Sequence, residues 1–163
     1  MSSKSSTEST PPHDRKRLIS SIKQSLRVLS IQLSLLNHQV SEHLGLNDVD
    51  LDCLDLINRH GPLSPSALAQ RAALHPATMT GILDRLERGG WVARERDPSD
   101  RRAVRVRALR DRNAELIRLY GGMNSSMTDI CSSYTVAELA VLADFLGRTV
   151  DAGHGATERL AQG

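Results

Sequence analysis

Residues 64–109 read SPSALAQRAALHPATMTGILDRLERGGWVARERDPSDRRAVRVRAL, and this stretch decides the fold. Its first part predicts two helices joined by a tight turn at Leu74-His75. Ser64 is a favourable N-cap, and Pro65 follows at the first helical position, where its missing N–H costs nothing. Pro76 opens the second helix, and Gly89-Gly90 ends it. The apolar residues of that second helix recur at helical spacing: Met79, Ile82, Leu83 and Leu86.

The second part of the stretch predicts a two-stranded β-ribbon. Residues 91–96 and residues 103–108 both alternate between apolar and polar side chains. Residues 97–100, Asp-Pro-Ser-Asp, are typical turn residues. The face of the second strand that we expect to be buried carries Val104, Val106 and Ala108. Leu63-Ser64 is expected to add a short third strand, so the whole pattern is that of a winged helix-turn-helix.

Positive charge is concentrated on this module. Residues 59–112 contain twelve arginines and six acidic residues, a net charge of +6, whereas the whole chain carries +2 and the remainder therefore −4. Arginine suits phosphate and guanine contacts, although a GC-rich genome gives the same bias. Charge runs are usually solvated surface. This one coincides with a ribbon tip beside a candidate recognition helix, and therefore favours DNA binding.

Several motifs in this stretch belong to one recognisable pattern. They are Leu68-Ala69, the sequence PATMT at residues 76–80, the sequence LDRLERGG at residues 83–90 and, most specifically, the wing sequence RDPSDRRA at residues 96–103. With these motifs the chain resembles the MarR family of bacterial transcriptional regulators, from about residue 15 to about residue 152. The resemblance implies a homodimeric, sequence-specific regulator on a near-palindromic operator in double-stranded DNA. It also implies that the regulator is a repressor released by a small effector.

Amphipathic helices are expected on both sides of the module. From residue 14 to about residue 44, apolar residues follow one another at steps of three or four, and Gly45 ends the pattern. A small domain cannot cover so long an apolar face alone, which implies a partner helix, most simply from a second copy of the chain. After residue 109 helical spacing continues, with a kink expected at Gly121-Gly122. Thr135 and Glu138 form a capping box that starts a final helix.

These patterns divide the chain into parts. Residues 1–13, rich in Ser and Thr, are expected to form a disordered tail. Residues 14–46 and 110–152 are expected to form a helical dimerisation region, residues 47–109 the DNA-binding domain, and residues 153–163 a flexible tail. The predicted fold is therefore mainly α, with a winged helix-turn-helix between N-terminal and C-terminal dimerisation helices.

The second helix of the motif and the wing have different expected roles at the DNA. Thr78 is the best candidate for a base-edge or methyl contact. Gly81 occupies a position where the family often has a basic residue. We therefore expect recognition of DNA to depend more on the wing and on DNA shape. By resemblance, Arg102 enters the minor groove and Asp100 pairs with it to fix the turn. Phosphate contacts are expected from Arg96, Arg101 and Arg105. The remaining candidates are Ser64, Ser66, His75, Ala77, Thr80 and Arg85.

The resemblance also implies a pocket for a small aromatic or anionic effector. The expected lining residues are Asn37, Val40, Ser41, Cys53, Leu54, Ile57, Arg118 and Tyr120. Cys53 and Cys131 are too few for a disulfide framework. Because Cys53 lies among leucines, we interpret it as a buried, inert thiol, and a thiol-based redox-sensing regulator of the same fold is an alternative. The histidines show no metal-ligand spacing, so neither a metal nor another cofactor is predicted.

Other classes of protein lack support in the sequence. It has no Gly-rich phosphate loop, no G-x-S-x-G and no H-E-x-x-H, so we do not predict an enzyme. No apolar run approaches the roughly 18 residues of a membrane span, and the N-terminus has no apolar signal segment. The protein is therefore expected in the cytoplasm, associated with the nucleoid. The alternative function is a nonspecific or architectural DNA-binding protein, which the near-neutral total charge disfavours.

Overall fold

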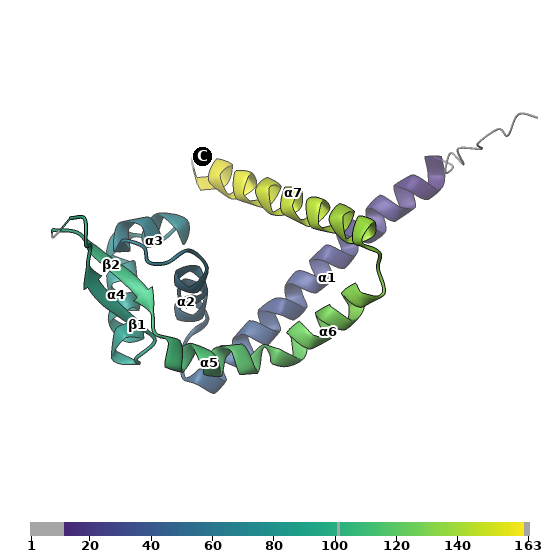
Figure 1. Ribbon diagram of the computed structural model, residues 1–163. Helices are drawn as coiled ribbons and strands as arrows, with labels where there is room; N and C mark the ends of the chain where they lie inside the picture. The colour runs from purple at the N-terminus through teal and green to yellow at the C-terminus, as the bar shows by residue number, and fades with distance from the viewer. Residues whose placement is uncertain (1–11, 101, 162–163) are drawn as a thin grey trace, which may run out of the picture. The chain divides into compact units, whose positions relative to one another are not determined.

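The computed structural model describes residues 12–100 and 102–161 (Figure 1). The chain divides into two compact units, one extending to Leu116 and the other beginning at Ile117. The helices are α1 Pro12–Leu44, α2 Asp48–His60, α3 Pro65–Arg71, α4 Pro76–Arg88, α5 Arg110–Leu119, α6 Gly121–Ser132 and α7 Val136–Ala161. The strands are β1 Val92–Arg96 and β2 Val104–Ala108. This mainly helical architecture with one antiparallel hairpin confirms the predicted fold class.

The first helix is longer at its start than the sequence indicates. α1 begins at Pro12, so Pro12 and His13 are helical although their composition assigns them to the tail. The rest of the predicted tail, residues 1–11, lies outside the described residues. α1 ends at Leu44, and the next residue, Gly45, has a φ of 66°, the left-handed conformation that glycine adopts without strain. Among the described side chains of α1, the fully buried ones are Val40 and Ser41, near the end that packs against α2.

The helix starts in the first unit depend on local capping. Asn47 caps α2 by accepting a hydrogen bond from the backbone N–H of Asp50 at 2.8 Å. Ser64 caps α3 in the same way through Ala67 N–H at 3.2 Å. The predicted cap at Ser64 is confirmed. Each of the two caps satisfies one of the backbone donors that a helix N-terminus leaves without a partner.

The turn between α3 and α4 lies slightly earlier than predicted. Ala73, at a φ of 52°, makes the reversal, and His75 is the N-cap of α4. At the other end of α4, Gly90 has a φ of 73° and confirms the predicted capping glycine. Gly89 is required for space, because a Cβ there would lie 2.8 Å from Cδ1 of the buried Trp91. The four predicted apolar residues of α4 are all buried: Met79, Ile82, Leu83 and Leu86.

The wing is a short antiparallel hairpin attached to this core. β1 and β2 pair in a register that sets Val92 opposite Ala108 and Arg96 opposite Val104. The predicted third strand is a single bridge between Leu63 and Val106, with hydrogen bonds of 3.1 and 2.7 Å. Val106 is fully buried, whereas Val104 is 39 % exposed. Val104 lies near the tip of the hairpin, beyond the helices that cover its inner face.

The second unit contains α6 and α7 and differs from the sequence expectation at two places. The helical pattern after residue 109 is interrupted at Tyr120, immediately before the predicted kink at Gly121-Gly122. The predicted capping box is confirmed, since Thr135 N–H and Oγ1 both donate to Glu138 at 2.8 Å. α7 then continues to Ala161, so residues 153–161 of the predicted flexible tail are helical. Residues 158–161 are good helix formers, which accounts for the extension.

Apolar side chains remain exposed on the longest helices. On α1 they are Leu18, Ile19, Ile22, Val28, Leu29, Ile31, Leu33 and Leu35, and on α7 they are Val136, Val141, Leu142, Phe145, Leu146, Val150 and Leu160. Within residues 12–100 and 102–161, no helix combines the length and the apolar character needed to cross a membrane. Extended apolar surfaces of this kind usually mark an interaction site.

Candidate nucleic-acid interface

The first two turns of α4 present a cluster of small side chains to solvent. Ala77, Thr78 and Thr80 are exposed and Gly81 is half-buried. The helix orients them outward because its opposite side is packed into the core. The Thr80 hydroxyl donates to the backbone carbonyl of Pro76 at 3.1 Å. The structure therefore brings the predicted α4 candidates together on one accessible face.

The hydroxyls and the imidazole predicted at the helix starts have capping roles. Ser64 is half-buried, and its Oγ lies 3.1 Å from Oγ of the exposed Ser66. His75 is exposed, and its Nδ1 accepts a hydrogen bond from Ala77 N–H at 3.2 Å. A neutral His75 then carries its hydrogen on Nε2, where it is available to an anion beside the N-terminus of α4.

Arg85, a candidate DNA contact, is 47 % exposed and forms an ion pair with a buried carboxylate. Its Nε and Nη2 donate to the two carboxylate oxygens of Asp50 at 2.8 and 2.7 Å. The Asp50 side chain is 3 % exposed and belongs to α2. This bidentate pair therefore attaches α4 to α2. The sequence carries no signal for it, since the two residues are 35 positions apart.

A second arginine connects the wing to α4. Arg94 in β1 donates from Nη2 to Asp84 and from Nη1 to Glu87, both at 2.6 Å. Its backbone N–H also donates to Glu87 at 3.1 Å. These three hydrogen bonds fix the base of the hairpin against the helix. Sequence reasoning missed this role, because alternation along a strand does not indicate which carboxylate an arginine meets.

The wing turn is organised by Asp97, which is also absent from the predicted site. Its side chain is 8 % exposed, and its Oδ1 accepts hydrogen bonds from Ser99 N–H at 2.8 Å and Ser99 Oγ at 2.6 Å. Its other oxygen pairs with Nε of Arg105. The hydrogen bonds from Ser99, and then the charge of Arg105, hold the pKa of Asp97 below its usual value. The detectable signal was the Asp-Pro-Ser pattern, which favours such a turn.

Asp100 fixes the tip through the backbone. Its Oδ1 accepts the backbone N–H of Arg102 at 2.9 Å, and its carbonyl accepts that of Ala103 at 2.9 Å. Asp100 therefore shapes the turn as expected, but by holding the Arg102 main chain. The Arg102 side chain is exposed. Arg101, another predicted contact, lies outside the described residues.

The arginines of the wing fall into two groups. Arg105 pairs with Asp97 and Arg107 pairs with Glu95 across the hairpin. Arg96 and Arg102 are exposed, and neither forms an ion pair with any residue that the structure describes. Of the wing arginines that the structure describes, Arg96 and Arg102 thus remain available to a nucleic acid, and both are close to the tip.

The predicted effector residues differ in exposure and belong to two units of the chain. Val40, Ser41, Cys53, Leu54 and Ile57 are at most 4 % exposed and belong to the packed core, and the Ser41 hydroxyl donates to Asp48. Asn37 and Tyr120 are half-buried and Arg118 is exposed. Arg118 and Tyr120 belong to the second unit, whereas the other six belong to the first.

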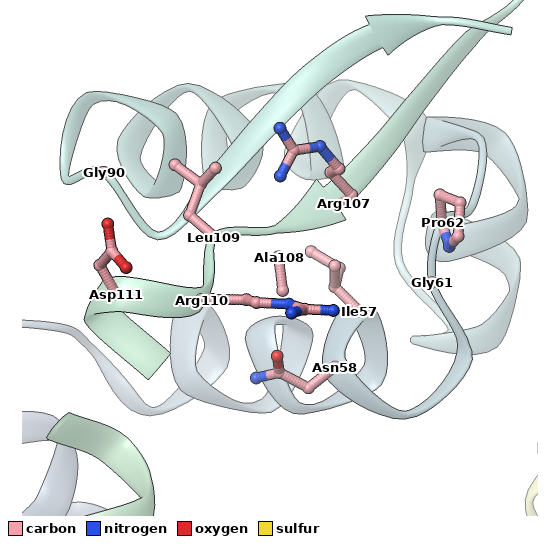
Figure 2. A pocket seen from close by; sticks show the side chains of 10 residues that line it. All are labelled: Ile57, Asn58, Gly61, Pro62, Gly90, Arg107, Ala108, Leu109, Arg110 and Asp111. Atoms are coloured by element: carbon pink, nitrogen blue, oxygen red, sulfur yellow. The ribbon is translucent and has the colours of Figure 1, made fainter. Parts of the chain in front are cut away.

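A cleft of about 730 Å³ lies elsewhere in the first unit, at the junction of α2, β2 and α5 (Figure 2). It shares Ile57 with the predicted lining and adds two cationic side chains, Arg107 and Arg110. Asn58, on one side of this cleft, donates to the buried Asn113 of α5 at 2.8 Å. No group of three or more potential metal ligands occurs among residues 12–100 and 102–161.

We expect the two cysteines to differ strongly in reactivity. Cys53 is 1 % exposed, and burial raises the pKa of its thiol to about 11, so it stays protonated at neutral pH. Cys131 is half-buried. A thiol reagent at pH 8 should therefore label Cys131 first and Cys53 only after unfolding, as peptide mass spectrometry can measure. Equal labelling of both in the folded protein would revive the redox alternative.

Comparison with known proteins agrees with this geometry. The model of the MarR family matches residues 46–104. The HTH-type transcriptional regulator YcgE of Bacillus subtilis is 33 % identical over 150 residues, which cover 92 % of this chain and 97 % of YcgE. The transcriptional repressor MdtR of the same organism is 25 % identical, over 83 % of this chain and 88 % of MdtR. Streptococcus pneumoniae FabT, solved in complex with DNA, has a similar fold, with a TM-score of 0.61 at 20 % identity over 84 % of this chain and 98 % of FabT.

Proposed function

Because the chain belongs to the MarR family of DNA-binding transcriptional regulators, we propose that it is a homodimeric, sequence-specific repressor that leaves its operator when a small effector binds. One observation carries this proposal. The small-residue face of α4 and the wing tip with Arg96 and Arg102 are both accessible. Such a regulator works in the cytoplasm, where it meets the nucleoid.

The two parts of this surface suit the two grooves of DNA. A recognition helix reads base edges in the major groove with its N-terminal residues, and Ala77, Thr78 and Thr80 occupy that position here. An arginine at a hairpin tip suits the narrow minor groove, whose negative potential attracts it. We therefore assign direct readout to α4 and minor-groove contact to Arg102. Ser64, Ser66, His75 and Arg96 supply phosphate contacts.

The exposed apolar faces support dimerisation. α1 alone exposes eight large apolar residues, and burying such a surface is favourable by about 25 cal/mol for each Å². A second copy of the chain is the simplest partner, since two-fold symmetry pairs identical faces. A two-fold dimer also sets two recognition helices toward successive major grooves, as a near-palindromic operator requires.

Repression and effector release are supported by fewer observations than DNA binding. The relative MdtR is named a repressor, and so is YetL of Bacillus subtilis, which is 32 % identical over 52 % of this chain. In the cleft Arg107 is paired with Glu95 and Asp111 adds a carboxylate, so Arg110 is the cation that this lining offers to a small anion next to the start of α5. An occupant there would contact both the wing and α5. We therefore propose an aromatic or anionic effector.

The test is a binding titration at near-physiological salt. One fluorescent duplex comes from the DNA upstream of the protein's own gene or, if that duplex shows no preference, from a random library enriched by the protein. The control is an unrelated duplex of equal length. We expect a difference in affinity of about a thousandfold or more, with two chains for each operator. Equal weak binding to enriched and control duplexes would identify a nonspecific DNA-binding protein. Release of the bound duplex then serves to screen small carboxylates and phenols.

A further inference from the structure

We infer that the first two turns of α4 recognise thymine through its 5-methyl group, with Ala77 and Thr78 as the specificity-determining residues. This inference rests on the proposed function, because it names the base that the operator presents to the helix. It starts from a feature of the accessible face that the family assignment does not supply: its side chains are small, and the nearby charges are already paired.

The 3.6-residue repeat of the helix places one row of α4 residues on the side that faces solvent. Ala77, Gly81, Asp84 and Arg88 succeed one another at steps of four, three and four, opposite the buried side. Thr78 flanks this row. Residues 76–83 read PATMTGIL and contain no Arg, Lys, Asn, Gln, Asp or Glu. The part of the helix that normally meets base edges therefore carries only methyl groups, hydroxyls and backbone.

The charged residues of α4 closest to its first two turns have partners within the protein or lie farther along the helix. Arg85 is paired with the buried Asp50 through Nε and Nη2, while its Nη1 lies 3.7 Å from where a Cβ of Gly81 would stand. Asp84 is bonded to Arg94 of the wing. Arg88 is exposed, but it lies ten residues beyond Thr78, about 15 Å along the axis. His75, at the N-cap, offers a single N–H, which suits a phosphate.

Each base pair requires its own chemistry in the major groove. Guanine is read by Arg or Lys, adenine by Asn or Gln, and the cytosine amino group by a carboxylate. The thymine methyl is read by an apolar contact, such as an Ala or a Thr methyl group. Of these, the first two turns of α4 supply the apolar contact; their Thr hydroxyls can pair with more than one base, so the methyl groups are the more specific element. Gly81 projects no side chain of its own, and Nη1 of Arg85 lies 3.7 Å from where its Cβ would stand.

The experiment uses the operator found by the titration and replaces its bases one at a time. Deoxyuridine in place of thymidine removes only the methyl group, and 7-deazaguanine in place of guanine removes the major-groove acceptor N7. We expect deoxyuridine at one or two positions of each half-site to weaken binding about fourfold per position, the effect of one buried methyl. The same loss should disappear in either Thr78→Ser or Ala77→Gly, whichever residue makes the contact.

Thr157→Ser is the matched control, because it removes the same methyl group from an exposed threonine of α7, outside the surface assigned to DNA, whose hydroxyl is bonded to the Gly153 carbonyl. It should leave both the affinity and the deoxyuridine effect unchanged. Specific binding that is insensitive to every deoxyuridine overturns the inference, whether 7-deazaguanine weakens it or not, while the proposed function stands. Absence of any preferred duplex in the titration contradicts the proposed function itself, so the two failures are distinguishable.

Discussion

Replacing Arg102 by alanine should weaken operator binding by about thirtyfold or more and leave thermal stability nearly unchanged. A well-placed arginine contact contributes about 1–3 kcal/mol to DNA recognition, and a dimer loses it in both half-sites. The Arg102 side chain is exposed and forms no ion pair with any described residue, so its removal breaks no interaction within the described protein. The backbone hydrogen bond from Arg102 to Asp100 survives, because alanine keeps the N–H.

Arg107→Ala is the matched control for Arg102→Ala. It removes the same charge from the same hairpin, but from the base rather than the tip, where the guanidinium pairs with Glu95. We expect its operator affinity to stay within about threefold of wild type, since a paired surface arginine contributes little. Fluorescence titration gives the affinities and thermal melts give the stabilities. If Arg102→Ala binds as tightly as Arg107→Ala, the wing does not contact DNA through this residue.

Replacing Asp50 by asparagine should lower the free energy of unfolding by about 1–2 kcal/mol and the melting temperature by several degrees. The substitution leaves Arg85 without its ionised partner in a bond that attaches α4 to α2. Breaking a fully buried pair costs about 3–5 kcal/mol, but the Arg85 side chain is 47 % exposed, so solvent compensates part of the loss. Operator affinity should also fall, because α4 loses a support behind its reading face.

Asp55→Asn provides the comparison on the same helix. Asp55 pairs with Arg59 at 2.7 Å, with side chains 50 % and 69 % exposed, and such a pair contributes about 0.5 kcal/mol or less. Denaturant unfolding at one protein concentration compares the variants, since the proposed dimerisation would make stability concentration-dependent. Arg85→Gln alone should resemble Asp50→Asn, and the double variant should lose little more. An Asp50→Asn protein as stable as Asp55→Asn would show that this ion pair does not hold α4.

The features that the sequence predicted correctly depend on neighbouring residues. The caps at Ser64 and Thr135 involve residues three positions away, and Gly45 and Gly90 are required by a local backbone conformation. The buried face of α4 follows from spacing alone. Each of these could be inferred because the chain brings the interacting groups together without help from the fold.

The features that it missed are contacts between distant residues. Arg85 meets Asp50, and Arg94 meets both Asp84 and Glu87, only after α2, α4 and the hairpin have packed together. With twelve arginines and six acidic residues between positions 59 and 112, composition permits many pairings and selects none. The expected effector lining stays a prediction, because periodicity indicates which side chains face inward but not whether a space remains between them.

The paired arginines of the wing also affect how the protein responds to ions around it. DNA binding is driven largely by release of the counterions condensed on phosphates, with a salt dependence that follows the number of phosphates neutralised. An arginine already paired with a carboxylate must leave that partner, which then attracts a cation from solution, so the net release is smaller. Arg94, Arg105 and Arg107 are in this state. The affinity for DNA is therefore less sensitive to changes in the salt concentration of the cell than the number of arginines suggests.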